Sequence, residues 1–162
     1  MAIEYFLKLE GIAGEAAASK HTSEIEVKSW SWAASNPASI SGQGLSAGKF
    51  ALSDLSITKP VDKSSAKLLE LCCTGKHISK GVLTCAKSTG DKNPADYLTL
   101  KLEEIVITSL QCGGSSGEDI GIESMSLTAG KYTFDYKLQG KDGTLTAAGT
   151  ANIDQFLRES SS

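Results

Sequence analysis

The sequence predicts a mainly β protein: one closed, bent β-barrel with a single side α-helix at about residues 64–74 and a long extended loop at about 35–48. Three observations support this fold class. About seven or eight segments alternate polar and apolar side chains between short stretches of Gly, Ser, Asn and Asp. Four long segments change the parity of their apolar positions partway. A chain of 162 residues is the length of one domain, so we expect residues 1–162 to form a single barrel domain.

The first two segments show both features. The segment at residues 3–9 places alternate apolar side chains on one face: Ile3, Tyr5, Leu7 and Leu9. The stretch "EIEVKSWSW", residues 24–32, has apolar side chains first at odd and then at even positions: Ile25 and Val27, then Trp30 and Trp32. Side chains on a regular strand alternate between faces, so an uninterrupted strand cannot bury all four. We therefore expect a bulge between Val27 and Trp30.

The same change of parity recurs in three later segments. The positions before and after each change are Phe50 and Leu52, then Leu55 and Ile57; Leu98, Leu100 and Leu102, then Ile105 and Ile107; Ile120 and Ile122, then Met125 and Leu127. Bulges bend a strand while one face stays buried. Closing a sheet into a small barrel requires bent, twisted strands.

A hairpin and one helix complete the prediction. Residues 131–138 alternate without a change of parity, and the turn "GKDG" at 140–143 leads into a last strand through residues 145–153. Between residues 64 and 74, Leu68, Leu69 and two cysteines recur at helical spacing. Asp62 or Ser64 can cap the start of this helix, and Gly75 suits a left-handed C-cap.

The stretch "SNPASISGQGLSAG", residues 35–48, is longer than a hairpin needs. Loops of this length in compact domains are usually functional or disordered. Its isolated apolar residues, Ile40 and Leu45, indicate docking on something outside the monomer. A floppy surface loop is the alternative.

Charge and cysteine content exclude several function classes. A net charge of −3 gives no positive field that would attract nucleic acid. The chain also has no run of Lys and Arg of the kind that binds an anionic membrane surface. The N-terminal residues lack the pattern of a signal peptide, so we expect synthesis in the cytoplasm. The four cysteines have no metal-ligand spacing, and we expect them to be reduced and buried: Cys72, Cys73, Cys85 and Cys112.

Residues for catalysis are missing too. The chain has only two histidines, and His77 follows Cys73 across a helix C-cap, where the two side chains need not meet. The stretch "GLSAGKF" is one residue too short for a phosphate loop. Glu103 and Glu104 are consecutive on a strand, so we expect them to face opposite sides. We expect no enzyme, no cofactor and no metal.

Small polar residues occupy the other face of several strands, among them Ser29, Ser31, Ser53 and Ser56. Such a face is either an ordinary solvent-exposed sheet surface or the lining of a wide, wet passage that binds nothing strongly.

The order and spacing of several motifs resemble a known family. The motifs are "FLKLEGIAGE", "HTSEIEVKSWSW", "SAGK", "DLSITKPVDKSSAKLLELCCTGKHI", "DYLTLKLEEIVITS" and "GGSSGEDIGIESMSL". Together they resemble the haemolysin-coregulated protein (Hcp) family, the tube subunit of bacterial type VI secretion systems, over nearly the whole chain. The chain departs from the family at the doublet Cys72-Cys73 and at the C-terminal "DQFLRESSS".

The resemblance implies a compact β-barrel that assembles into hexameric rings, which stack into a tube. A contractile sheath expels the tube with effectors and a spike tip, and the ring holds effectors as chaperone and receptor. The implied partners are other copies of the chain, secreted effectors, and the sheath and spike proteins, without nucleic acid or membrane. Export would occur through the machine itself, into the medium or a target cell.

The resemblance also implies roles for individual residues. Ser31 would face the ring lumen with Ser29 and Ala33, while both tryptophans turn into the core. The loop would reach an adjacent subunit or the next ring through five residues: Asn36, Pro37, Ile40, Gln43 and Leu45. Charged turns are candidates for ring stacking: Asp62, Lys63, Glu118 and Asp119.

Two other functions stay open. A phage tail-tube protein would be mechanically similar, and a monomeric barrel could bind a small molecule. The second needs an interior cavity, whereas the large core side chains seen in the sequence can fill a small barrel.

Overall fold

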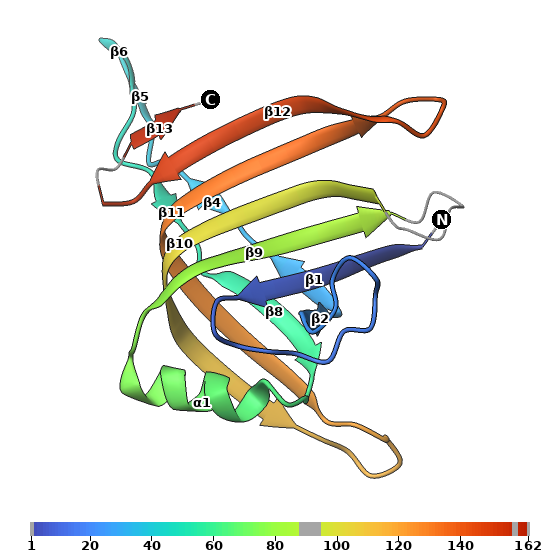
Figure 1. Cartoon of the computed structure of the whole chain (residues 1–162). Helices are drawn as coiled ribbons and strands as arrows, with labels where there is room; N and C mark the ends of the chain where they lie inside the picture. Colours follow the sequence, from blue (N-terminus) through green and yellow to red (C-terminus); the bar gives the residue numbers. More distant parts are fainter. Residues whose placement is uncertain (1, 88–94, 157–158, 162) are drawn as a thin grey trace.

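The computed structural model of the chain describes residues 2–87, 95–156 and 159–161. It is mainly β with one helix (Figure 1). The elements are β1 (Ile3–Leu9), β2 (Ile25–Val27), β3 (Ser29–Ser31), β4 (Ala34–Ser35), β5 (Ser39–Ser41), β6 (Gly44–Ser46), β7 (Ala51–Leu52), β8 (Leu55–Pro60), α1 (Ser65–Thr74), β9 (Ile78–Lys87), β10 (Ala95–Gly113), β11 (Ile122–Gln139), β12 (Leu145–Asp154) and β13 (Glu159–Ser161).

The main sheet curves round into the predicted barrel. Its strands follow the order β13-β12-β11-β10-β9-β1-β2, and β8 joins β11 to β3. Strands β2 and β3 are separated only by Lys28, whose backbone amide donates to the carbonyl of Thr58 at 2.8 Å. The sheet therefore returns onto itself where β2 runs into β3. Strand β11 pairs with β8 through its first half and with β12 through its second, and β10 accompanies both halves.

The barrel encloses one main apolar core, to which most strands contribute. Its fully buried members include Leu7, Ile25, Leu55, Leu102 and Leu127. Trp30 and Trp32 are partly buried and pack against this core, and Trp32 stacks on Tyr132 with ring centroids 4.9 Å apart. Most of the side chains predicted for the interior therefore meet there, but Ile3 and Ile120 are exposed.

Helix α1 begins one residue later than predicted and packs on one end of the barrel, where Leu68 and Leu71 join the core. The Asp62 carboxylate accepts a hydrogen bond from the Ser64 amide at 2.9 Å, while the Ser64 side chain caps no helix amide. Gly75 ends the helix with φ +69°, and its amide donates to the carbonyl of Leu71 at 2.9 Å. This left-handed conformation is costly for residues with a Cβ atom, as the sequence predicts.

The first two changes of parity occur where the chain changes strands. Before Lys28 the chain forms β2, which pairs with β1. After Lys28 it forms β3, which pairs with β8. This is a change of partner, and the predicted bulge within one strand pair is absent. Ser53 and Asp54 separate β7 from β8 in the same way. Each break rotates the next strand, so both parities face the core.

The third change of parity is a local kink in β10. Glu104 has φ +56°, which interrupts the alternation between Leu102 and Ile105. Glu103 and Glu104 are both exposed, so the expectation that they face opposite sides is wrong. The paired strand β11 changes parity nearby, at Ala129 and Gly130, both of which are buried. A second irregularity in β10 is a register shift between Ile107 and Ser109.

The fourth predicted bulge is absent. Residues Ile122–Leu127 pair with β8 without any shift of register, and the inward position next to Ile122 belongs to Glu123. Glu123 lies opposite Lys59, and both side chains have no exposed surface. The sequence pattern was misleading because a charged residue fills a core position.

The buried pair lies in a polar network at the helix end of the barrel. The Lys59 ammonium contacts the Glu123 carboxylate, and it lies 3.1 Å from Asp62 Oδ1. It also donates to the carbonyl of Pro60 at 3.0 Å. The Ser65 hydroxyl donates to Glu123 Oε2 at 2.8 Å. Both charges are thereby compensated, as buried ions must be.

The C-terminal hairpin forms as predicted, with Gly143 at φ +85° in its turn. Beyond β12, the Gln155 side chain donates to the carbonyl of Ala129 at 2.6 Å. The Phe156 ring lies against the Cα of Gly130, where a Cβ atom would meet it at 2.2 Å. Residues 155 and 156 thus pack on the kink of β11, at the start of the segment for which the sequence suggested no role.

The four cysteines are free, in agreement with the prediction, but they are not all buried. Only Cys85 is fully buried, whereas Cys73 and Cys112 are exposed.

Candidate functional site

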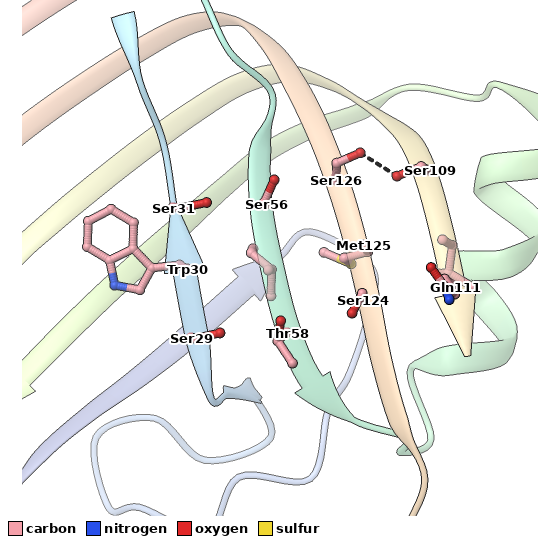
Figure 2. Close-up of a pocket in the computed structure, with 12 residues that line it drawn as sticks. Ser29, Trp30, Ser31, Ser56, Thr58, Ser109, Gln111, Ser124, Met125 and Ser126 are labelled. Atoms are coloured by element: carbon pink, nitrogen blue, oxygen red, sulfur yellow. Dashed lines mark hydrogen bonds between the residues drawn. The ribbon is translucent and has the colours of Figure 1, made fainter. Parts of the chain in front are cut away.

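Two rows of small polar side chains cross four paired strands, β3, β8, β11 and β10. Strand register places them side by side. One row is Ser29, Thr58, Ser124 and Gln111, and the other is Ser31, Ser56, Ser126 and Ser109. Figure 2 shows both rows on one face of the sheet. They line an open groove of about 570 Å³.

The apolar side chains between the two rows belong to the opposite face. Trp30, Ile57, Met125 and Leu110 are register partners, and all four belong to or pack against the barrel core. Figure 2 shows Trp30 directed away from the two rows. The strands therefore alternate strictly here, with a dry face toward the core and a hydroxyl face toward the groove.

The groove is uncharged along its whole lining. At one end its hydroxyls are joined in a chain: Ser109 to Ser126 at 2.5 Å, Ser126 to Thr108 at 2.8 Å, and Thr108 to Asp54 Oδ2 at 2.7 Å. Because the carboxylate only accepts, Thr108 donates to it, Ser126 donates to Thr108 and Ser109 donates to Ser126.

The rest of the groove keeps its hydrogen-bonding capacity. Within the described residues, six lining side chains make no side-chain hydrogen bond: Ser29, Ser31, Ser56, Thr58, Gln111 and Ser124. Such a surface holds water and makes weak neutral hydrogen bonds, with no ionic contact to trap a passing molecule.

Of the residues expected on one polar face, Ser29, Ser31 and Ser56 lie together in the groove, whereas Ser53 lies outside its lining. Ala33 is exposed but lies outside the lining, and its amide donates to the hydroxyl of Ser53 at 2.8 Å. Most of the groove residues were missed by sequence reasoning. Their signal was the small hydroxyl residue at outward positions of neighbouring strands, which becomes visible only once strand partners are known.

The segment at 35–48, predicted as a long extended loop, is a projecting hairpin. Strands β5 and β6 pair through Ser39 with Ser46, Ile40 with Leu45 and Ser41 with Gly44. Strands β4 and β7 pair at its base. Figure 1 shows this hairpin projecting from the barrel, at the opposite end of the molecule from α1.

The tip of the hairpin presents two large apolar side chains to solvent. Ile40 is 86% exposed and Leu45 is 74% exposed. Asn36 Oδ1 accepts from the Gly48 amide at 3.1 Å, and Pro37 lies against Gly48, so these residues shape the base. Gln43 is exposed in the turn.

The four charged candidates lie near α1, in the β8–α1 and β10–β11 connections (Figure 1). Lys63, Glu118 and Asp119 are exposed. The Asp62 side chain is only 7% exposed and is engaged with Lys59 and Ser64. Asp62 therefore organises this end of the barrel from inside.

Both histidines contact carboxylates, and no hydrogen bond between a histidine and a cysteine is found among the described residues. His77 lies 3.7 Å from Glu104, and both side chains are more than half exposed. His21 is buried between Glu24 and Asp96. Within residues 2–87 and 95–156, no helix is long and apolar enough to cross a membrane.

Comparisons with known proteins define the class of this chain as a type VI secretion protein. Residues 6–136 match the family described as "Type VI secretion system effector, Hcp". The chain is 39% identical over 144 residues to Protein hcp1 of Pseudomonas aeruginosa, with 88% of each chain covered. The chain belongs to the Hcp family.

Solved structures agree. One is described as the structure of a type six secretion system protein: it has a TM-score of 0.92 and 27% identity and covers 99% of this chain and 100% of its own. Hcp1 from Salmonella typhimurium has a TM-score of 0.78 and 28% identity, with 99% of each chain covered. These similarities confirm the barrel fold and the family expected from the sequence motifs.

Proposed function

We propose that this chain is a structural subunit of the type VI secretion inner tube. Six copies form a ring, rings stack, and the tube is expelled through the machine with effectors held in its lumen. Membership of the Hcp family supports this assignment, and the hydroxyl groove is the observation that carries it. Its partners are other copies of itself, secreted effectors, and the sheath and spike of the machine.

In this proposal the hydroxyl groove faces the lumen. Cargo in a transport channel must be retained and then released, so the wall cannot bind it tightly. Neutral hydrogen bonds contribute only about 0.5–1.5 kcal/mol each, because each replaces a bond to water. Eight such side chains on one subunit make a wall that holds cargo through many weak contacts.

The groove is tested by Ser31→Gln, which adds a long side chain to the centre of one row. Rings should remain intact while a co-expressed effector copurifies less. The matched control is Ser79→Gln, at an exposed serine on β9 outside the groove. If Ser31→Gln abolished the ring, Ser31 would be an interface or core residue.

The hairpin supplies the contact with a neighbouring subunit or ring. Burying one Ile or Leu side chain contributes about 1.5–3 kcal/mol. Burial of Ile40 and Leu45 would therefore stabilise each contact between subunits, and the contact is repeated around the ring. Asn36, Pro37 and Gln43 would shape and flank this contact. Lys63, Glu118 and Asp119, with Asp62 holding their end of the barrel in place, would take part in ring stacking.

Leu45→Asp tests the hairpin, with Leu138→Asp as a control because Leu138 is an exposed leucine outside it. Size-exclusion chromatography with light scattering should report a hexamer for the control and smaller species for Leu45→Asp. An unchanged hexamer for Leu45→Asp would remove the hairpin from the interface.

Two alternatives predict other results. A small-molecule-binding barrel would be a monomer at micromolar concentration, whereas the proposed tube subunit would be a hexamer. A phage tail-tube protein would also form rings, but it would not copurify with type VI effectors.

A further inference from the structure

Strand β10 carries an extra residue beside the hydroxyl groove. The pairing of β10 with β11 shifts register between Ile107 and Ser109, so Thr108 has no register partner on β11. An extra residue of this kind redirects the side chains around it. The Thr108 and Ser109 hydroxyls therefore reach the same partner, Ser126, at 2.8 and 2.5 Å (Figure 2).

Asp54 contacts this trio of hydroxyls from outside the groove. It directly precedes β8, and its Oδ2 accepts a hydrogen bond from the Thr108 hydroxyl at 2.7 Å. Asp54 is not among the residues that line the groove. Among the described residues, no lysine forms an ion pair with it. Because hydrogen bonds to an ionised carboxylate are roughly twice as strong as those between neutral groups, the Thr108 proton is firmly placed.

The carboxylate sets the direction of all three hydroxyl protons. A hydroxyl has a single proton, and that of Thr108 is used on Asp54. The contact of Thr108 with Ser126 must then use the Ser126 proton, and the contact of Ser126 with Ser109 must use the Ser109 proton. What remains for a ligand at this end of the groove is oxygen lone pairs, which accept hydrogen bonds.

The remainder of the groove has no such bias. Among the described residues, Ser29, Ser31 and Ser124 line the groove and make no side-chain hydrogen bond. A hydroxyl without a fixed partner can both donate and accept. The groove thus has a polarised end at Ser109 and a part, around Ser29, that takes either kind of group.

We propose that Asp54 is a positioning residue that acts through Thr108 to make the Ser109 end of the groove a site for hydrogen-bond donors, namely the Lys and Arg side chains of a cargo protein. The inference rests on the proposed function, in which the groove faces cargo. The orientation of the hydroxyls is a property of the single chain and can be measured without cargo.

Lys and Arg side chains match the polarised end because they carry several donors and no acceptor. A carboxylate, which only accepts, finds no proton there. The contact is made by neutral hydroxyl oxygens, since Asp54 itself does not line the groove. Each such contact is weak, in keeping with cargo that must be released.

Two substitutions separate the orientation of the hydroxyls from the charge of Asp54. Thr108→Val keeps the carboxylate but cuts its link to Ser126, and Asp54→Ala removes the carboxylate. The matched controls are Thr150→Val and Asp135→Ala, because the Thr150 hydroxyl donates to Asp135 at 3.1 Å in a similar pair outside the groove.

The probes are methylguanidinium, which only donates, and dimethyl sulfoxide, which only accepts. Titrations of the full chain are followed by NMR at the amides of Ser109 and Ser29. In the unchanged chain, the Ser109 signal should respond to methylguanidinium more strongly than to dimethyl sulfoxide. In Thr108→Val and Asp54→Ala, the affinity for dimethyl sulfoxide at Ser109 should rise about two- to tenfold, the range that one neutral hydrogen bond contributes. The signal of Ser29 and both control variants should keep their responses.

A neutron crystal structure gives a second readout that depends on no probe. The deuterons of Ser109 and Ser126 should point along the chain toward Asp54. The proposal is overturned if the Ser109 deuteron points into the groove, if Ser109 responds equally to both probes in the unchanged chain, or if Thr108→Val leaves the preference unaltered, which would mean that the charge of Asp54 acts alone. Failure of the tube proposal would appear separately, as a monomer in light scattering whose probe preference at Ser109 is intact.

Discussion

The buried pair of Lys59 and Glu123 offers a quantitative test of how this barrel is stabilised. Removing one partner of a buried ion pair costs about 3–5 kcal/mol, because the other charge is left without compensation. The two single substitutions differ in the contacts that the remaining charged side chain keeps. Without Glu123, the ammonium keeps Asp62 at 3.1 Å and the Pro60 carbonyl at 3.0 Å.

Without Lys59, the Glu123 carboxylate keeps, among its described partners, only the Ser65 hydroxyl at 2.8 Å and the weak thiol donor of Cys112 at 3.6 Å. We therefore expect Lys59→Met to cost about 5 kcal/mol and Glu123→Leu about 3 kcal/mol. The double variant replaces the pair with apolar side chains of similar size, so its unfolding free energy should return to within about 1–2 kcal/mol of the original.

Urea unfolding followed by tryptophan fluorescence measures these differences, since both tryptophans pack on the core. All variants should be compared at one subunit concentration, because assembly would add to apparent stability. A double variant whose cost equals the sum of the single costs would refute the reasoning, as would a Lys59→Met cost below about 1 kcal/mol.

Three further predictions concern single positions. Gly130→Ala should destabilise the chain, because the new Cβ meets the Phe156 ring at 2.2 Å, and Phe156→Ala should restore most of the loss in a thermal melt. Burial raises the pKa of the Cys85 thiol to about 11, so a thiol reagent at pH 8 should label Cys73 rapidly and Cys85 only after unfolding; equal rates would contradict the assigned burial. Tyr132→Phe should cost about 1–3 kcal/mol in urea unfolding, because the tyrosine hydroxyl accepts from a buried amide at 2.9 Å; no change would show that water replaces it.

Alternation of side chains predicted the barrel and most of its core, because a strand with one buried face has apolar residues at every second position. It also located three of the four irregular positions. The sequence did not show what kind of irregularity occurs at each position, because that depends on which strands pair in the fold. Lys28 marks a change of strand partner, whereas Glu104 marks a backbone kink.

Two features escaped prediction for the same physical reason. Glu123 at an inward position is stable only because Lys59 lies opposite it, 64 residues away in the chain. The polar rows of the groove exist only because four strands align their hydroxyl residues in register. By contrast, Ile40 and Leu45 could be singled out from the sequence as isolated apolar residues, and both side chains are exposed, although the hairpin that pairs them was not predicted.

The pairing of β8 with β11 also affects how the chain folds during synthesis. Strands β1 and β8 can pair early with β2 and β3, but they leave the ribosome before their other partners, β9 and β11, exist. Long-range pairing of this kind slows folding and leaves strand edges open to wrong partners. The local β10–β11 hairpin supplies the last partner that β8 needs. The barrel therefore cannot close until the residues of β11 that pair with β8 have been synthesised.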